Sequence, residues 1–188
     1  MRFSTIILAC VALSGCAHLQ SIAPLPAPSP VTSVPIATAC GPFVNGATLI
    51  AISSQIAANS ATQIGTIAGY AATDSNGVSG LSATAFAGRI GDVIQFFNAE
   101  PIGSTIVHSA AQIAGTTFPS SPYAFPASLD AEVGSTIALA TWSTGRIAAG
   151  SSQICYSQPL TLKAAGTYLF GDVDHYNDAT LRSYIVVN

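Results

Sequence analysis

The residues of this chain that are best spaced for chemistry lie at positions 168–175, which read Tyr-Leu-Phe-Gly-Asp-Val-Asp-His. In an extended strand Tyr168, Phe170 and Asp172 share one face, because successive side chains alternate between faces. Two aromatic side chains on that face predict a buried core, and Asp172 then lies where the strand meets a loop. His175 follows three residues later, across a tight loop. A carboxylate and an imidazole so placed are ligand types for a divalent metal ion.

This stretch resembles the metal-loop strand of the cupredoxins, the plastocyanin-like small copper proteins. In that family the pattern reads Tyr-x-Phe-x-Cys-x-x-His, and the Cys and His hold copper. Residues 91–98 (GDVIQFFN) look like the family's Gly-Asp-x-Val-x-Phe-x-Asn turn and strand, and residues 106–108 (IVH) look like the segment with its first copper-binding histidine. The resemblance covers residues 83–187. It implies an all-β, cupredoxin-like Greek-key β-sandwich with a metal site formed by His108, Asp172 and His175.

The candidate site departs from the family at two ligands. Asp172 replaces the thiolate, and no Met follows His175, because the only Met is Met1. Two imidazoles and a carboxylate form a harder donor set, suited to Cu(II), Zn(II) or Fe(II). The resemblance implies binding of copper or another divalent metal, in metal handling or electron transfer, with a protein redox or metal-transfer partner. The lost Cys favours handling over transfer. The alternative is a metal-free structural or interaction sandwich.

Other readings of the site residues remain open at this point. Asp172 could instead cap the loop or pair with Arg182. Glu100, in the loop before His108, could approach the site. Asp174 and Asp178 are interpreted as solvated loop charges.

The N-terminus indicates export. Residues 1–16 combine a positive Arg2, a short apolar core and the sequence Leu-Ser-Gly-Cys, which resembles a bacterial lipoprotein signal. Cys16 would then carry lipid and anchor the chain to a membrane of the cell envelope, at its periplasmic or extracellular face. The alternative is a plain secretory signal cut nearby, for instance after Ala17. Residues 17–36 are Pro-rich and predict an extended tether or a leader without further role. The domain itself is assigned to residues 37–188.

Cysteine usage agrees with an exported chain. Of the 4 Cys, Cys10 is removed with the signal and Cys16 is the lipidation candidate. Cys40 and Cys155 remain as an even pair, which predicts a disulfide in an oxidising compartment. The alternative is two buried free thiols.

Composition narrows the function classes. Charged residues make up 7% of the chain and the formal net charge is −3, which excludes a basic nucleic-acid surface. Mean hydropathy is +0.52, yet no apolar run is long enough to span a bilayer. We find no nucleophile elbow or phosphate loop, so we predict no enzyme activity.

Short apolar segments separated by turn residues predict a series of strands. Residues 53–69 are ambiguous between helix and strand, and residues 109–133 form a long insert that either covers the site, offers a partner surface or packs locally. The predicted strands are 48–52, 83–87, 93–98, 105–108, 136–141, 160–162, 167–171 and 183–187.

Overall fold

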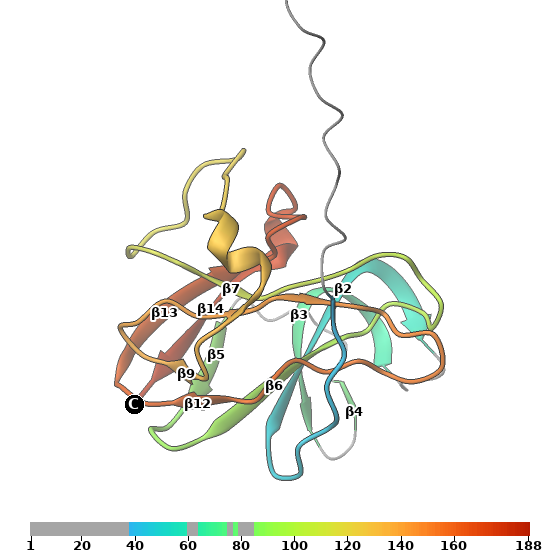
Figure 1. Ribbon diagram of the computed structural model, residues 1–188, viewed down its shortest axis with the longest axis horizontal. Helices are drawn as coiled ribbons and strands as arrows, with labels where there is room; N and C mark the ends of the chain where they lie inside the picture. Colours follow the sequence, from blue (N-terminus) through green and yellow to red (C-terminus); the bar gives the residue numbers. More distant parts are fainter. Residues whose placement is uncertain (1–37, 60–63, 75–76, 79–84) are drawn as a thin grey trace, which may run out of the picture. The chain divides into compact units, whose positions relative to one another are not determined.

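The computed structural model describes residues 38–188 except 60–63, 75–76 and 79–84. The predicted export signal, Cys16 and the Pro-rich tether lie outside these residues. The described chain is all-β: two 6-stranded sheets of mixed strand direction lie in two layers, and a short parallel pair flanks them (Figure 1). No α-helix occurs in the described part, only two short 3₁₀ turns. The predicted all-β class is thereby confirmed.

The first sheet has the strand order β5-β14-β13-β7-β10-β8 and the second β4-β3-β2-β6-β12-β9. The bounds in the first sheet are β5 (Ala85–Gly88), β14 (Arg182–Val187), β13 (Gly166–Gly171), β7 (Ala111–Ile113), β10 (Ser143–Thr144) and β8 (Glu132–Val133). Those in the second are β4 (Gly77–Val78), β3 (Ile64–Asp74), β2 (Thr48–Asn59), β6 (Val93–Asn98), β12 (Leu160–Leu162) and β9 (Thr136–Ile137). The flanking pair is β1 (Thr38–Ala39) and β11 (Arg146–Ile147), and the 3₁₀ turns are η1 (Ala127–Asp130) and η2 (Ala179–Leu181).

Aromatic residues dominate the core between the sheets. Phe96 of β6 and Phe170 of β13 are fully buried, and their ring centroids lie 5.5 Å apart in an edge-to-face arrangement. Tyr70 of β3 packs at 4.8 Å from Phe170, and Trp142 at 5.9 Å. Such pairs add about 0.5–1.5 kcal/mol each beyond the burial of their area. These rings pack against Phe170, near the end of β13, and Asp172 directly follows that strand.

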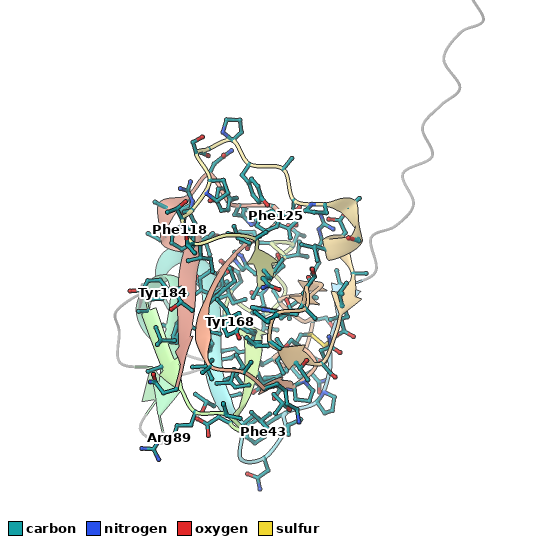
Figure 2. The ribbon with its side chains drawn as sticks, turned by 90° about the vertical axis from the view of Figure 1, so that its left-hand side faces the viewer. Phe43, Arg89, Phe118, Phe125, Tyr168 and Tyr184 are labelled. Atoms are coloured by element: carbon teal, nitrogen blue, oxygen red, sulfur yellow. A yellow bond between two sulfur atoms is a disulfide. The ribbon has the colours of Figure 1, made fainter. Side chains whose placement is uncertain are left out.

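The alternation predicted for β13 is present. Tyr168 and Phe170 belong to the core between the sheets, whereas Leu169 packs on the outer face. On that outer face, Phe118, Tyr123 and Phe125 of the long insert pack against a cluster that includes Leu169 and Tyr176 (Figure 2). The insert therefore packs locally on its own sheet, as one of the three alternatives expected.

Two predicted strands are wrong in extent. Residues 105–108 form a single bridge at His108, because the carbonyl oxygen of Ile106 accepts a hydrogen bond from the Asn98 side chain instead of a neighbouring strand. Residues 138–141 leave the sheet after Ile137, and Leu139 is 92% exposed. The described residues of the ambiguous segment, 53–59 and 64–69, lie in the long antiparallel pair β2 and β3, whose register shifts after Ser53.

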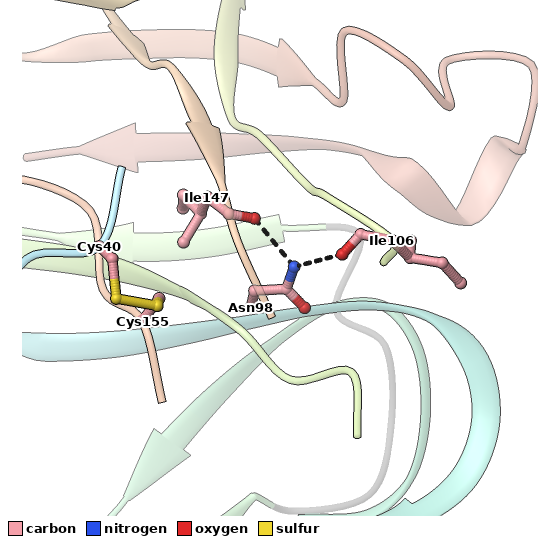
Figure 3. Close-up of a disulfide and its surroundings, with 5 residues drawn as sticks. All are labelled: Cys40, Asn98, Ile106, Ile147 and Cys155. Atoms are coloured by element: carbon pink, nitrogen blue, oxygen red, sulfur yellow. Dashed lines mark hydrogen bonds between the residues drawn. A yellow bond between two sulfur atoms is a disulfide. The ribbon is translucent and has the colours of Figure 1, made fainter. Parts of the chain in front are cut away.

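A disulfide joins Cys40, directly after β1, to Cys155, before β12 (Figure 3). The two residues are 115 apart in sequence, with Cα atoms 4.4 Å apart. The alternative of two free thiols is therefore wrong. Because β1 pairs with β11, the disulfide fixes the beginning of the domain beside the segment that carries Arg146 and Ile147.

Candidate metal centre

Three side chains predicted as ligands meet at one end of the sandwich. His108 lies at a bridge with Ile147, Asp172 directly follows β13, and His175 lies in the next loop. One ligand atom from each of the three can be chosen so that all lie within 4.8 Å of one another. His108 and Asp172 are fully buried, and the side chain of His175 is 35% exposed. The cluster is thus closed toward the core and reaches solvent at His175.

Both ring nitrogens of His108 contact carboxylates. Nδ1 lies 2.6 Å from Asp172 Oδ2, and Nε2 lies 2.9 Å from Glu100 Oε1. Glu100 follows β6 and is itself buried, and its Oε1 also accepts hydrogen bonds from the backbone N–H and the hydroxyl of Ser54. Sequence reasoning allowed Glu100 to approach the site, and the structure gives it a defined place on the far side of the imidazole from Asp172.

Asp172 also organises the loop that carries His175. Its Oδ1 accepts the backbone N–H groups of Asp174 at 2.9 Å and His175 at 3.2 Å. This is the capping role that the sequence left open, and it coexists with the contact to His108. Arg182, the other suggested partner, instead donates its Nε to the carbonyl of Tyr176 and lies over that ring.

His175 supplies the second imidazole. Its Nδ1 lies 3.3 Å from Asp172 Oδ2, but no hydrogen bond forms there, and within the described chain this buried nitrogen has no hydrogen-bond partner. The rings of His108 and His175 have centroids 5.1 Å apart. A buried nitrogen lone pair or N–H without a partner is costly, which is one reason to expect a further group at this position.

The electrostatics of the cluster favour charge on every member. Burial alone would lower the pKa of His108, but its hydrogen bonds with Asp172 and Glu100 outweigh burial and raise the pKa to about 9. Burial would likewise raise the pKa values of Asp172 and Glu100, yet the histidine contacts, and for Glu100 also Ser54, lower both to about 2. The contact with Asp172 raises the pKa of His175. In the absence of an ion, His108 is therefore an imidazolium between two carboxylates.

Two of the three ligand separations can be compared with those around a bound metal ion. Two ligand atoms bound to one tetrahedral Zn²⁺ lie roughly 3.3–3.4 Å apart, since each bond is about 2.0–2.2 Å long. The separation of 3.3 Å between His175 Nδ1 and Asp172 Oδ2 already matches this value. The separation of 2.6 Å between His108 Nδ1 and Asp172 Oδ2 must lengthen by roughly 0.7 Å as the proton between them leaves. Glu100 would stay on Nε2, the kind of carboxylate contact that orients metal-binding histidines.

One ion pair near the site has no counterpart in the sequence-based interpretation. Asp174, expected to be a solvated loop charge, receives two hydrogen bonds from Arg146, at 2.6 Å and 2.7 Å. Arg146 also pairs with Asp130 of η1 at 3.2 Å. Asp178 is exposed and caps η2 by accepting the backbone N–H of Thr180. Arg146 therefore ties the loop of His175 to β11.

Among known proteins, this chain shows similarity only to solved structures. No family model matches the chain, and no curated protein matches it. A reduced Trp-to-Tyr variant of amicyanin has a TM-score of 0.40 and 13% identity over 80% of this chain and 90% of its own. An oxidised Pro-to-Gly variant of amicyanin has the same TM-score and coverage at 15% identity. The chain is thus distantly similar in structure to amicyanin, a cupredoxin.

Proposed function

We propose that this protein binds a divalent metal ion, copper or a chemically similar ion such as zinc, through His108, Asp172 and His175. The observation that carries the proposal is the convergence of these three side chains, which come from distant parts of the sequence, with the Nδ1 of His175 buried and lacking a hydrogen bond. Two imidazoles and one carboxylate suit Cu(II) or Zn(II), and a bound ion would act as a Lewis acid or be held for transfer. The absence of a thiolate favours metal handling over fast electron transfer.

Each residue has a separate task in this proposal. Nδ1 of His108, once it has lost its proton, and Nδ1 of His175 would offer lone pairs to an ion held beside Asp172 Oδ2. Asp172 keeps its Oδ1 on the backbone of the loop and has Oδ2 for the ion. Glu100 would hold the Nε2–H of His108 and so fix which nitrogen is free for the metal.

A metal titration tests the proposal. The exported chain is titrated with Zn²⁺ and with Cu²⁺ at pH 7.5 while the melting temperature is recorded. Binding only to the folded state stabilises by about 2.7 kcal/mol at an ion concentration of 100 times Kd. Asp172→Asn should abolish this gain, whereas Asp178→Asn, an exposed acid in the same loop, should keep it. Unchanged melting of the natural chain with either ion would remove the proposal.

A metal-free structural or interaction module is the second candidate function. The two contacts of His108 favour it, because a protonated ring donates one N–H to Asp172 and the other to Glu100 without any ion. The same titration decides between the two, and proton release on adding metal supports the first.

We further propose that the chain is an envelope lipoprotein, anchored through lipid on Cys16, whose exposed His175 edge meets a protein partner that exchanges metal. The motif at residues 1–16 supports export, and the disulfide suits an oxidising compartment. None of the described residues form a helix of sufficient length and hydropathy to cross a membrane. Labelling with a radioactive fatty acid should mark the natural chain and not Cys16→Ser. Equal labelling of the two would refute the anchor.

A further inference from the structure

Asn98, the last residue of β6, is 1% exposed and makes three hydrogen bonds through its side-chain amide. Its Nδ2 donates to the carbonyl oxygens of Ile106 at 3.0 Å and Ile147 at 2.9 Å, as Figure 3 shows. Its Oδ1 accepts the backbone N–H of Glu100 at 2.9 Å. Every polar atom of this side chain therefore bonds to a backbone group.

The three backbone groups surround His108. Ile106 is two residues before it, in a segment that forms no strand. Ile147 is its bridge partner, since the N–H of His108 donates to the Ile147 carbonyl at 3.1 Å and the Ile147 N–H donates back at 2.6 Å. Glu100 provides the carboxylate on Nε2 of His108. The Asn98 side chain thus links three parts of the site: the segment that precedes His108, strand β11 beside it, and Glu100, whose carboxylate contacts the His108 ring.

We propose that Asn98 is a positioning residue of the metal centre, which sets the placement of His108 and of its contact with Glu100. As a role in metal binding, this inference rests on the proposed function. The start of the loop is tied to β2 by the Ala99 N–H on the Ile52 carbonyl, and Gly103 donates to Gly150. Residues 104–107 form no strand, and apart from the Asn98 bond to Ile106 their hydrogen bonds stay within the loop, from Ser104 to Pro101 and from Ile106 to Ser104. Without the Asn98 donors, the part-buried carbonyl oxygen of Ile106 and the buried one of Ile147 would each lose a hydrogen bond, and the segment would shift to recover them from water.

The same strand offers a matched control. Gln95 of β6 is also buried, and it also makes three hydrogen bonds to backbone groups: Nε2 to Pro42 and Ser157, and Oε1 from Val44. None of these groups adjoins His108 in the chain or bonds to it. Asn98→Leu and Gln95→Met replace each amide by an apolar side chain of similar size, so both variants lose the same number of bonds.

The experiment compares these two variants with the natural full chain. Zn²⁺ affinity is measured by competition with a chromophoric chelator, and the absorption spectrum with Co²⁺ reports coordination geometry. We expect Asn98→Leu to weaken Zn²⁺ binding by about 10- to 100-fold and to alter the Co²⁺ spectrum, the loss typical of outer contacts to a metal ligand. Gln95→Met should change the affinity by less than about threefold at a similar loss of melting temperature. Equal affinities for the two variants would overturn the inference.

A second readout needs no metal. Protons on the His108 ring that bridge to carboxylates should give downfield, slowly exchanging NMR resonances in the natural chain. Asn98→Leu should lose the Nε2–H resonance, because Glu100 moves, and Gln95→Met should retain it. If the natural chain binds no metal, the proposed function fails, and this resonance alone decides whether Asn98 places Glu100 against His108. Should Asn98→Leu not fold, Asn98→Asp, which keeps the acceptor and loses both donors, is measured instead, and an unchanged resonance there would overturn the inference.

Discussion

Raising the pH should destabilise the metal-free protein between pH 6.5 and 9, because His108 loses one of the two ring protons that it donates to Asp172 and Glu100. The pKa of His108 is raised from 6.5 to about 9, since two carboxylate contacts outweigh the cost of burial. A group whose folded pKa is raised contributes its full stability below the unfolded pKa, here 6.5, and loses it as pH rises through the folded pKa. His175, whose pKa is also raised by Asp172, acts in the same direction.

The size of the effect follows from the shift. A difference of roughly 2.5 pKa units corresponds to about 3 kcal/mol of unfolding free energy, at 1.36 kcal/mol per unit. For a domain of this size that equals a fall of roughly 6–12 °C in melting temperature. On the acid side, the pKa values of Asp172 and Glu100 are lowered to about 2, so their contribution is lost as pH falls from about 4.5 toward 2. The two carboxylate shifts and the histidine shift describe the same contacts, so they are not summed. Stability should therefore be greatest between about pH 5 and 6.5.

Urea unfolding of the oxidised, chelator-treated protein at half-unit pH steps from 4 to 9.5 measures this profile. Glu100→Gln keeps an acceptor near Nε2 but removes one charge, so the decline above pH 6.5 should become shallower. Glu132→Gln, at an exposed glutamate of β8, should leave the slope unchanged. Constant stability from pH 6 to 9 in the natural protein would refute the assignment of His108 as a buried imidazolium.

Three further outcomes are expected. Asp172→Cys loaded with Cu(II) should gain an intense visible band, because a thiolate then completes the copper ligand set, and a colourless complex would contradict the equivalence of this position with the family cysteine. Replacing both Cys40 and Cys155 by Ser should lower the unfolding free energy in urea by about 4–5 kcal/mol, given a closed loop of 115 residues, and a loss under 1 kcal/mol would contradict the chain-entropy argument. Arg146→Met should cost about 1–3 kcal/mol in the same assay, because it leaves Asp174 without its bidentate partner, and a neutral result would show this ion pair to be fully screened.

The convergence of Asp172 and His175 could be predicted from local pattern alone. Strand alternation places Asp172 on the face of Tyr168 and Phe170, and a loop of three residues cannot carry His175 far. The place of His108 needed a family resemblance, since nothing within residues 104–109 states which strand lies beside them. The structure places Ile147 there.

The contacts that complete the site depend on loop paths, which sequence pattern does not encode. Glu100, whose carboxylate accepts hydrogen bonds from Ser54, reaches Nε2 of His108, and Asn98 bonds to the backbone at residues 100, 106 and 147. Neither a serine nor an amide side chain gives a periodic signal for such bonds. Arg146 and Asp174 are 28 residues apart and meet only after β11 and β13 are placed. Residues 53–69 stayed ambiguous for another reason: their many Ala, Ser and Thr residues give neither helical nor strand periodicity.

The ring protons of His108 have a consequence for how an ion could enter and leave. When both rings are protonated, a state that the raised pKa values of His108 and His175 favour, their charges balance those of Asp172 and Glu100, and a doubly charged cation with two neutral rings balances them again. Exchanging the ion for two protons therefore leaves no net charge stranded in the interior in either form. Many small metallo-domains are unfolded until the ion arrives, because the binding energy is their folding energy. This chain could bind and release an ion without unfolding, because protons would replace the ion whenever the site is empty.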